Sequence, residues 1–123
     1  CNKLIKKENA KKQFLERMKL RIDYLLQNKS ENVNYVIWGS GGSGKMTQKI
    51  MDKFLPNYHL CGLIDPYAQG DLNGIRIYKP EELMNLKADL IIISTTIGKK
   101  AAENFLVQQN LKVVDDYLYG YGL

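Results

Sequence analysis

Residues suited to bind a phosphate group cluster near position 40. The segment "YVIWGSGGSGKMTQKI", residues 35–50, contains an apolar run, four glycines, a lysine and then a helix-like pattern. Gly39, Gly41 and Gly44 have the G-x-G-x-x-G spacing of dinucleotide-binding loops. In such a loop the first glycine permits a tight turn, the second lets the backbone approach a diphosphate, and the third lets helix and sheet pack closely. Asp65 ends the next apolar run, 21 residues after Gly44, where an acid can accept hydrogen bonds from a ribose.

A nucleotide-hydrolysing Walker A loop is a competing interpretation of the same glycines. Gly39, Gly44 and Lys45 fit its first part. The next position, where that motif has a hydroxyl for Mg²⁺, is occupied by Met46. Thr47 comes one residue late, which on a helix turns it about 100° away. The dinucleotide pattern is therefore favoured, with a third alternative in which the loop has lost its ligand and only turns the chain.

The other elements predict an α/β fold with the glycine loop at its ligand-binding edge. Apolar, β-branched runs predict about five strands, and patterns of helical period between them predict helices on both faces of a parallel sheet. The expected fold is Rossmann-like with strand order 3-2-1-4-5. The predicted strands cover 32–39, 59–65, 75–78, 88–96 and 111–117.

Ligands of such sheets bind beyond the carboxyl ends of the strands, so the loops there supply the candidate site. Lys45 either reaches a phosphate or is solvated, and the run 94–96 either contacts a ribose or sugar or only caps the next helix. The candidate ligand-binding residues are Gly39, Ser40, Gly41, Gly42, Ser43, Gly44, Lys45, Asp65, Ser94, Thr95 and Thr96. No catalytic residue and no metal ligand is predicted, because His59 is the only histidine and no metal-ligand spacing occurs.

The N-terminal segment differs from the rest of the chain. Residues 1–29 contain nine Lys or Arg against three Asp or Glu, a balance of +6, whereas residues 30–123 have a balance of −1. Phe14, Met18, Ile22 and Leu25 recur at helical spacing and predict an amphipathic helix over 3–29. Its apolar stripe would pack on the domain, on another domain of a parent protein, or on a second copy; a membrane-surface helix is disfavoured. The expected division is 1–31 for the helix and linker and 32–123 for the Rossmann-like domain.

Composition favours an ordinary globular domain. The chain of 123 residues is 45% hydrophobic and 25% charged, with no run long enough to span a membrane. Two cysteines do not make a disulfide scaffold, which is typical of a cytoplasmic protein, and Cys61 is expected to be buried. Because the basic surplus lies outside the predicted domain body, we expect no nucleic-acid partner. The chain begins with Cys1 rather than Met, which suggests a piece of a longer protein.

Three runs of the sequence resemble one bacterial pattern: "YVIWGSGGSGK", "YHLCGLIDPYAQGDLNGIRIYKPEEL" and "ADLIIIST". They are similar to the nucleotide-binding N-terminal domains of polysaccharide-biosynthesis proteins (sugar-nucleotide dehydratases and epimerases) and of sugar O-acyltransferases. The resemblance covers residues 33 to about 115. It departs from the acyltransferases at Ser43, where a histidine often stands, and no Tyr-x-x-x-Lys pair of the dehydratases occurs in the chain.

The resemblance implies a module that binds NAD or a UDP-sugar, without a metal, inside a larger surface-glycan biosynthesis protein. Gly39, Gly41 and Gly44 would line the diphosphate, and Asp65 would lie on the ribose or uridine side. The catalytic apparatus of a parent protein would lie elsewhere. Two alternatives stay open: the cofactor domain of an oxidoreductase or dehydratase, and a ligand-free domain that binds a partner through helix 3–29.

Overall fold

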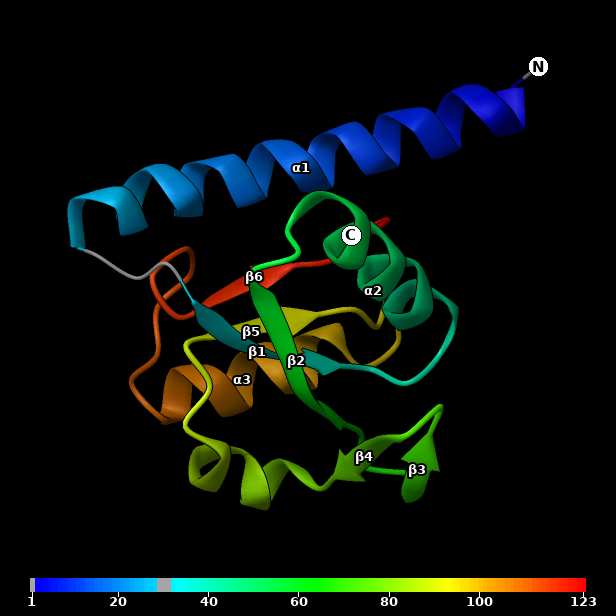
Figure 1. Ribbon diagram of the computed structural model, residues 1–123. Helices are drawn as coiled ribbons and strands as arrows, with labels where there is room; N and C mark the ends of the chain where they lie inside the picture. Colours follow the sequence, from blue (N-terminus) through cyan, green and yellow to red (C-terminus); the bar gives the residue numbers. More distant parts are fainter. Residues whose placement is uncertain (1, 29–31) are drawn as a thin grey trace.

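The computed structural model describes the backbone of residues 2–28 and 32–123, and the side chains of 5–20 and 32–123. Its centre is a sheet of six strands in the order β3-β4-β2-β1-β5-β6 (Figure 1). Five strands are parallel, and β3 runs antiparallel to β4. The strands are β1 (Val33–Trp38), β2 (Tyr58–Ile64), β3 (Gly70–Leu72), β4 (Ile75–Tyr78), β5 (Leu90–Ile93) and β6 (Tyr117–Tyr119). The predicted parallel α/β architecture and its strand order are confirmed, with β3 added at one edge.

Helices cover both faces of this sheet. On one face lie α1 (Asn2–Asn28) and α2 (Gly42–Phe54), and on the other lie α3 (Lys99–Gln108) and the 3₁₀ helix η1 (Pro80–Leu86) (Figure 1). β1 and β5 are buried along almost their whole length, as expected for central strands covered on both sides. No helix in the described part of the chain is long and apolar enough to cross a membrane.

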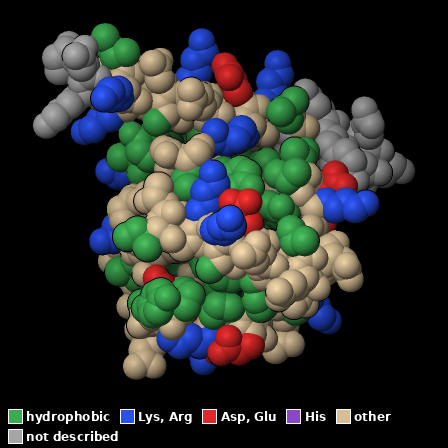
Figure 2. Space-filling model, turned by 180° about the vertical axis from the view of Figure 1, so that it is seen from behind, with side chains coloured by type: hydrophobic (Ala, Val, Ile, Leu, Met, Phe, Trp, Pro, Cys, Tyr) green, Lys and Arg blue, Asp and Glu red, His purple; other side chains and the backbone are tan. Residues whose placement is uncertain are grey.

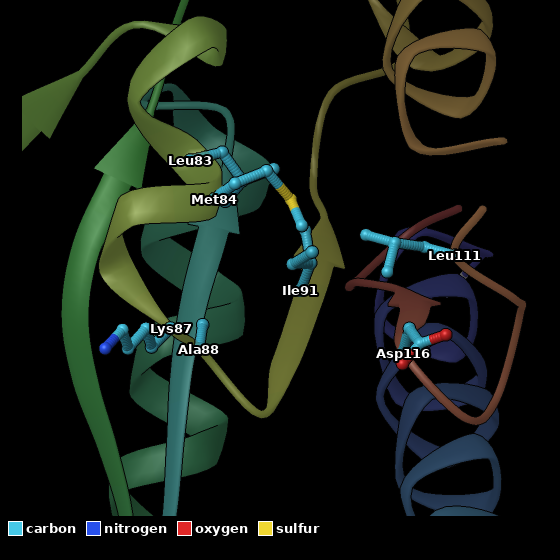
Figure 3. Close-up of a pocket in the computed structure, with 7 residues that line it drawn as sticks. All are labelled: Leu83, Met84, Lys87, Ala88, Ile91, Leu111 and Asp116. Carbon is cyan, nitrogen blue, oxygen red and sulfur yellow. The ribbon is translucent and has the colours of Figure 1, made fainter. Parts of the chain in front are cut away.

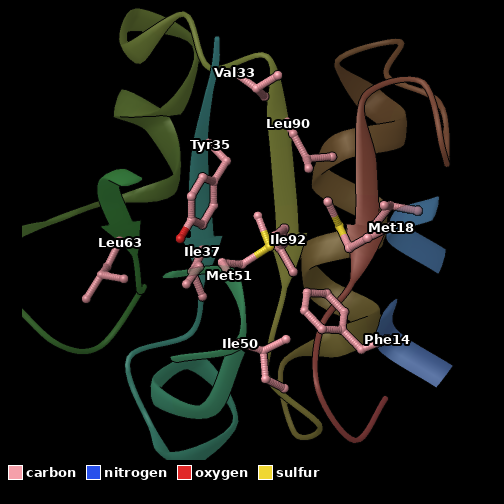
Figure 4. Close-up of a cluster of buried hydrophobic side chains, with 11 residues drawn as sticks. Phe14, Met18, Val33, Tyr35, Ile37, Ile50, Met51, Leu63, Leu90 and Ile92 are labelled. Atoms are coloured by element: carbon pink, nitrogen blue, oxygen red, sulfur yellow. The ribbon is translucent and has the colours of Figure 1, made fainter. Parts of the chain in front are cut away.

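The N-terminal helix α1 packs on the domain's own sheet. Phe14 and Met18 are 0% and 1% exposed and join a core cluster with Ile50 and Met51 of α2 (Figure 4). Arg17 donates from Nε to the Tyr119 carbonyl at 3.0 Å and from Nη2 to the Gly120 carbonyl at 2.7 Å. This part of the predicted stripe is therefore used within the chain. The side chains of Ile22, Leu25 and Leu26 lie outside the described residues, so a contact of helix 3–29 with another domain or copy stays a prediction.

One predicted loop is wrong in detail at an edge of the sheet. The turn-forming residues of 66–74, between the predicted strands 59–65 and 75–78, predict a loop, but the segment contains β3, which is joined to β4 by Asn73 and Gly74 with φ of 52° and 83°. Positive φ at two successive residues is typical of the type I′ hairpin turn, whose twist matches that of the strands.

The last strand begins later than expected. The run 111–117 predicts a strand, but residues 114–116 form a turn and β6 starts only at Tyr117. Asp116 closes this turn, because its Oδ2 accepts a hydrogen bond from the Lys112 amide at 2.8 Å and its own amide donates to the Lys112 carbonyl. β6 then runs from Tyr117 into the tail 118–123, in which the sequence pattern indicates no element.

Cys61 is exposed, and its expected burial is wrong. The register between β1 and β2 shifts between Tyr35 and Val36, whose partners are Leu60 and Gly62. Cys61 is the extra residue of this bulge, and its thiol donates to the Tyr35 carbonyl at 3.2 Å. The burial prediction depended on the apolar run around Cys61, and such a run does not indicate a bulge.

We expect Phe14→Ala to lower the free energy of unfolding by about 3–5 kcal/mol, because a fully buried aromatic side chain would be lost from the core. The neighbouring variant Gln13→Ala, at an exposed position of the same helix, should stay within about 0.5 kcal/mol of the unmodified chain. Urea unfolding followed by circular dichroism measures both. Equal stability of the two variants would contradict the packing of α1 on the sheet.

Candidate nucleotide-binding site

The first and third glycines of the loop are required by close backbone packing. Gly39 follows β1 with φ of +126°, and a Cβ there would lie 2.5 Å from the Ser94 carbonyl oxygen at the end of β5. A Cβ on Gly44, in the first turn of α2, would collide with the Gly39 carbonyl oxygen. The Gly39 amide donates to the Ile64 carbonyl at 2.8 Å, which ties the loop to the end of β2. The loop is thus locked between two neighbouring strands and α2.

No contact within the protein requires a glycine at the second position, Gly41. Gly41 precedes α2 with φ of −90° and ψ of −156°, a conformation open to other residues. A Cβ at Gly41 or at Gly42 would meet nothing within 4 Å. No side chain caps the start of α2. The first amides of this helix consequently face an open space with the partial positive charge of a helix N-terminus.

Asp65 anchors the loop that follows β2 and ties it to the glycine loop. Its Oδ2 accepts a hydrogen bond from the Ser40 hydroxyl at 2.6 Å, and its Oδ1 accepts from the amides of Tyr67 and Ala68 at 2.8 and 3.0 Å. Partial burial acts to raise the pKa of Asp65, but these hydrogen bonds outweigh burial and hold the pKa below its ordinary value. The carboxylate is therefore ionised at neutral pH and joins the glycine loop to the β2 end.

Lys79 also anchors the loop that follows β2. Its Nζ donates to the carbonyls of Pro66 and Ala68 at 3.2 and 3.0 Å. It stands directly before η1, and this position depends on the β3–β4 hairpin folding back beside Asp65. The sequence does not single out Lys79, because no local pattern indicates a contact across this hairpin.

A pocket of about 310 Å³ opens between the loops that follow β1, β2 and β5. Gly39, Asp65 and Thr95 line it together, so three predicted residues meet in one place. Two apolar side chains at its mouth are almost fully solvated: Tyr67 is 93% exposed and Ile97 fully exposed. Neither was predicted, since both lie in short loops without periodicity. The remaining lining residues are Trp38, Pro66, Gly98 and Ala101.

Several predicted hydroxyls are used inside the protein. The Ser94 hydroxyl is buried and lies 3.0 Å from Thr47 Oγ1. The Ser43 hydroxyl donates to the Tyr121 carbonyl at 2.6 Å. Thr95 Oγ1 accepts from the Gly98 amide at 3.2 Å while lining the pocket. Ser43 and Ser94 thus serve the packing around α2 in this structure.

Lys45 and Thr96 are both exposed. Lys45 lies on the first turns of α2, and Thr96 is not among the residues that line the pocket. Neither makes a hydrogen bond that would fix its side chain, within the part of the chain that the structure describes.

Thr47 bears on the Walker A alternative. It is fully buried, and its Oγ1 also accepts the Tyr121 amide at 2.9 Å. A hydroxyl enclosed in this way cannot face a metal ion in front of the loop. Among the described residues, no group of His, Cys, Asp or Glu is arranged to hold a metal ion.

A second hollow lies at the opposite edge of the sheet, between η1 and the segment before β6 (Figure 3). Its volume of about 60 Å³ is too small for a nucleotide. It is lined by Leu83, Met84, Lys87, Ala88, Ile91, Leu111 and Asp116.

No protein-family model and no curated protein sequence matches the chain. Among solved structures, it is similar to RSP, a Rex-family repressor, with a TM-score of 0.57 and 16% identity over 72% of this chain and 52% of RSP. RSP in complex with β-NAD⁺ and operator DNA aligns with a TM-score of 0.54 and 16% identity, over 72% of this chain and 49% of that one. UDP-D-quinovosamine 4-dehydrogenase from Vibrio fischeri aligns with a TM-score of 0.54 and 18% identity, over 66% of this chain and 75% of that enzyme.

The fold is Rossmann-like. At these identities the likeness shows the fold and carries no activity with it, and the chain spans only about half the length of RSP. The pocket lies where a Rossmann-like sheet places its ligand, beyond the carboxyl ends of its central strands.

We expect Gly39→Ala and Gly44→Ala each to lower the free energy of unfolding by about 1–3 kcal/mol, the first through strain at positive φ and the second through overpacking. Gly41→Ala should change it by less than about 0.5 kcal/mol, because the added methyl group meets no atom. Chemical denaturation of the three variants tests this Rossmann-like loop. A large loss in Gly41→Ala would show that the loop is packed differently.

The carboxyl group of Asp65 should titrate below its ordinary value of 3.8, and Ser40→Ala should raise the midpoint. A carboxyl whose pKa is lower in the folded than in the unfolded chain stabilises the fold above the unfolded value, and the contribution disappears as pH falls through the folded pKa. The stability difference between the unmodified chain and Asp65→Asn should therefore shrink in strong acid. Carbon-13 NMR of the side-chain carboxyl gives the midpoint, and a value above 3.8 would contradict the hydrogen-bonded geometry.

Proposed function

We propose that this chain binds an NAD-type dinucleotide, with its diphosphate at the start of α2 and its adenosine in the pocket beside Asp65. The observation that carries the proposal is Gly41. The fold itself explains Gly39 and Gly44 but leaves open space at Gly41, in front of a helix end with no capping side chain. A diphosphate lying against the backbone there would accept hydrogen bonds from the free amides of the first turn.

The charge and shape of the pocket support the same ligand. Asp65 is ionised and stands at the end of β2, where its carboxylate can accept hydrogen bonds from ribose hydroxyls. It would repel a 2′-phosphate, which favours NAD over NADP. Tyr67 and Ile97 offer apolar surface at the mouth for a flat base. A volume of about 310 Å³ suits one nucleoside half rather than a whole dinucleotide, so the nicotinamide half would extend beyond it.

A UDP-sugar is the second candidate, and it rests on the resemblance to polysaccharide-biosynthesis domains. The same loop would hold its diphosphate, and Asp65 would lie on the uridine side. In either case we propose a binding module of a larger surface-glycan biosynthesis protein, located in the cytoplasm, with the catalytic residues outside this chain. The division at residue 31 belongs to this proposal.

We expect NAD to raise the unfolding temperature of the chain by several degrees at about 100 times its dissociation constant, where ligand binding adds about 2.7 kcal/mol. NADP, UDP-N-acetylglucosamine, ATP with Mg²⁺ and duplex DNA are the comparison ligands. DNA is included because one similar structure contains operator DNA, which bears on our expectation that nucleic acid is not a partner. A shift with UDP-N-acetylglucosamine alone would favour the second candidate.

Two variants distinguish the loop from non-specific binding. Gly41→Ala should weaken NAD at least tenfold without loss of stability, whereas Gly42→Ala, which is equally uncrowded, is the matched control and should bind nearly as well. Asp65→Asn should narrow the preference for NAD over NADP, because the repelling charge is removed. Unchanged affinity in Gly41→Ala, measured by isothermal titration calorimetry, would overturn the proposed diphosphate position.

A further inference from the structure

A groove runs between α1 and α2, on the face of the sheet away from α3. It encloses about 240 Å³. Met46, Ile50, Phe54 and Tyr121 give it an apolar lining. Four lysines also line it, two from each helix: Lys7, Lys11, Lys49 and Lys53.

The positive charge of this groove is not neutralised from within. Glu8 is the only acidic residue that lines it, and none of the four lysines forms an ion pair within the described residues. Lys11 Nζ lies 4.9 Å and Lys53 Nζ 5.3 Å from the centre of the Phe54 ring. The ring, 42% exposed, therefore holds one ammonium group from each helix beside an apolar surface.

The groove continues along α1. A neighbouring hollow of about 470 Å³ shares Glu8, Lys11 and Phe54 and extends to Lys19; it adds Lys12, Leu15 and one further acid, Glu16. Lys7 and Lys19 are about 18 Å apart along a helix at 1.5 Å per residue. In Figure 2, which shows the molecule from behind, Lys and Arg side chains lie along the top, where α1 runs. The surface is long enough for an extended ligand rather than a single small anion.

We propose that this α1–α2 groove docks an acidic peptide segment of a partner protein that also carries apolar side chains. Carboxylates of the segment would pair with lysines from both helices, and an apolar side chain would enter the groove against Ile50 and Phe54. Charge complementarity over a partly apolar, concave surface is what such a segment requires. The proposal does not depend on a bound nucleotide, because none of the groove residues lines the nucleotide pocket.

Two other polyanions fit less well. A membrane surface would meet the lysines on the rim but is too flat to fill a groove between two helices. A single-stranded nucleic acid binds by stacking bases on exposed aromatic faces, and the face of Phe54 is already approached by two ammonium groups. An acidic peptide uses both the charge and the apolar lining.

Fluorescence anisotropy with the full chain tests the proposal. The probe is a labelled helical peptide with Glu and Asp on one face and Leu and Phe on the other. The comparison probes are the same peptide with Leu and Phe replaced by Ser, a labelled oligothymidine, and phosphatidylserine–phosphatidylcholine vesicles followed by co-sedimentation. We expect the acidic, apolar peptide to bind most tightly and to weaken as salt is added.

Lys53→Glu should weaken the peptide about tenfold, because attraction becomes repulsion. Lys100→Glu is the matched control: an exposed helix lysine on the opposite face of the sheet, where the same change of net charge should alter affinity less than about twofold. Phe54→Ala should weaken the acidic, apolar peptide but not its Ser-substituted form. All three side chains are exposed, so the free energy of unfolding of each variant should stay within about 1 kcal/mol of that of the unmodified chain.

Three results would overturn the proposal. Equal affinity for the two peptides would leave only non-specific charge attraction. An equal loss of peptide affinity in Lys53→Glu and Lys100→Glu would show that the groove is not the binding site. Tighter, Lys53-dependent binding of oligothymidine or vesicles would assign the groove to a nucleic acid or to a membrane instead.

Discussion

The packing of this fold depends on one place where segments of backbone lie too close together to leave room for a Cβ atom. Gly39 packs against the end of β5, Gly44 packs against Gly39, and Gly120 packs against the hydroxyls of Thr47 and Ser94. Two strands, one helix and the C-terminal segment therefore meet without room for a Cβ between them. This contact sets the distance of α2 from the sheet and brings its open N-terminus beside the pocket.

The C-terminal segment connects this point to the N-terminal helix. Tyr121 accepts a hydrogen bond from Ser43 and donates one to Thr47, both in α2. Arg17 of α1 donates to the carbonyls of Tyr119 and Gly120. The two helices that form the lysine-lined groove are thus held by the same few tail residues, through bonds between parts of the chain more than 70 residues apart.

The sequence predicts well what depends on neighbouring residues. The strand before Gly39, the helix after Gly44 and the acid at position 65 all follow from local periodicity and turn chemistry, and the structure places the loop and Asp65 side by side. What the sequence does not indicate depends on distant contacts. Ser43 and Ser94 look like surface hydroxyls in sequence, but the tail and Thr47 engage them. The start of β6 depends on a turn that Asp116 closes on Lys112. The strand therefore lies in the aromatic tail, where local periodicity does not indicate it.

The two edge strands of the sheet are its shortest. β3 and β6, which flank the other four strands, are three residues long each. Margins of this kind leave few backbone amides and carbonyls for another strand to pair with, a common means by which natural sheets resist edge-to-edge growth. Strand addition and amyloid-like stacking are thereby disfavoured.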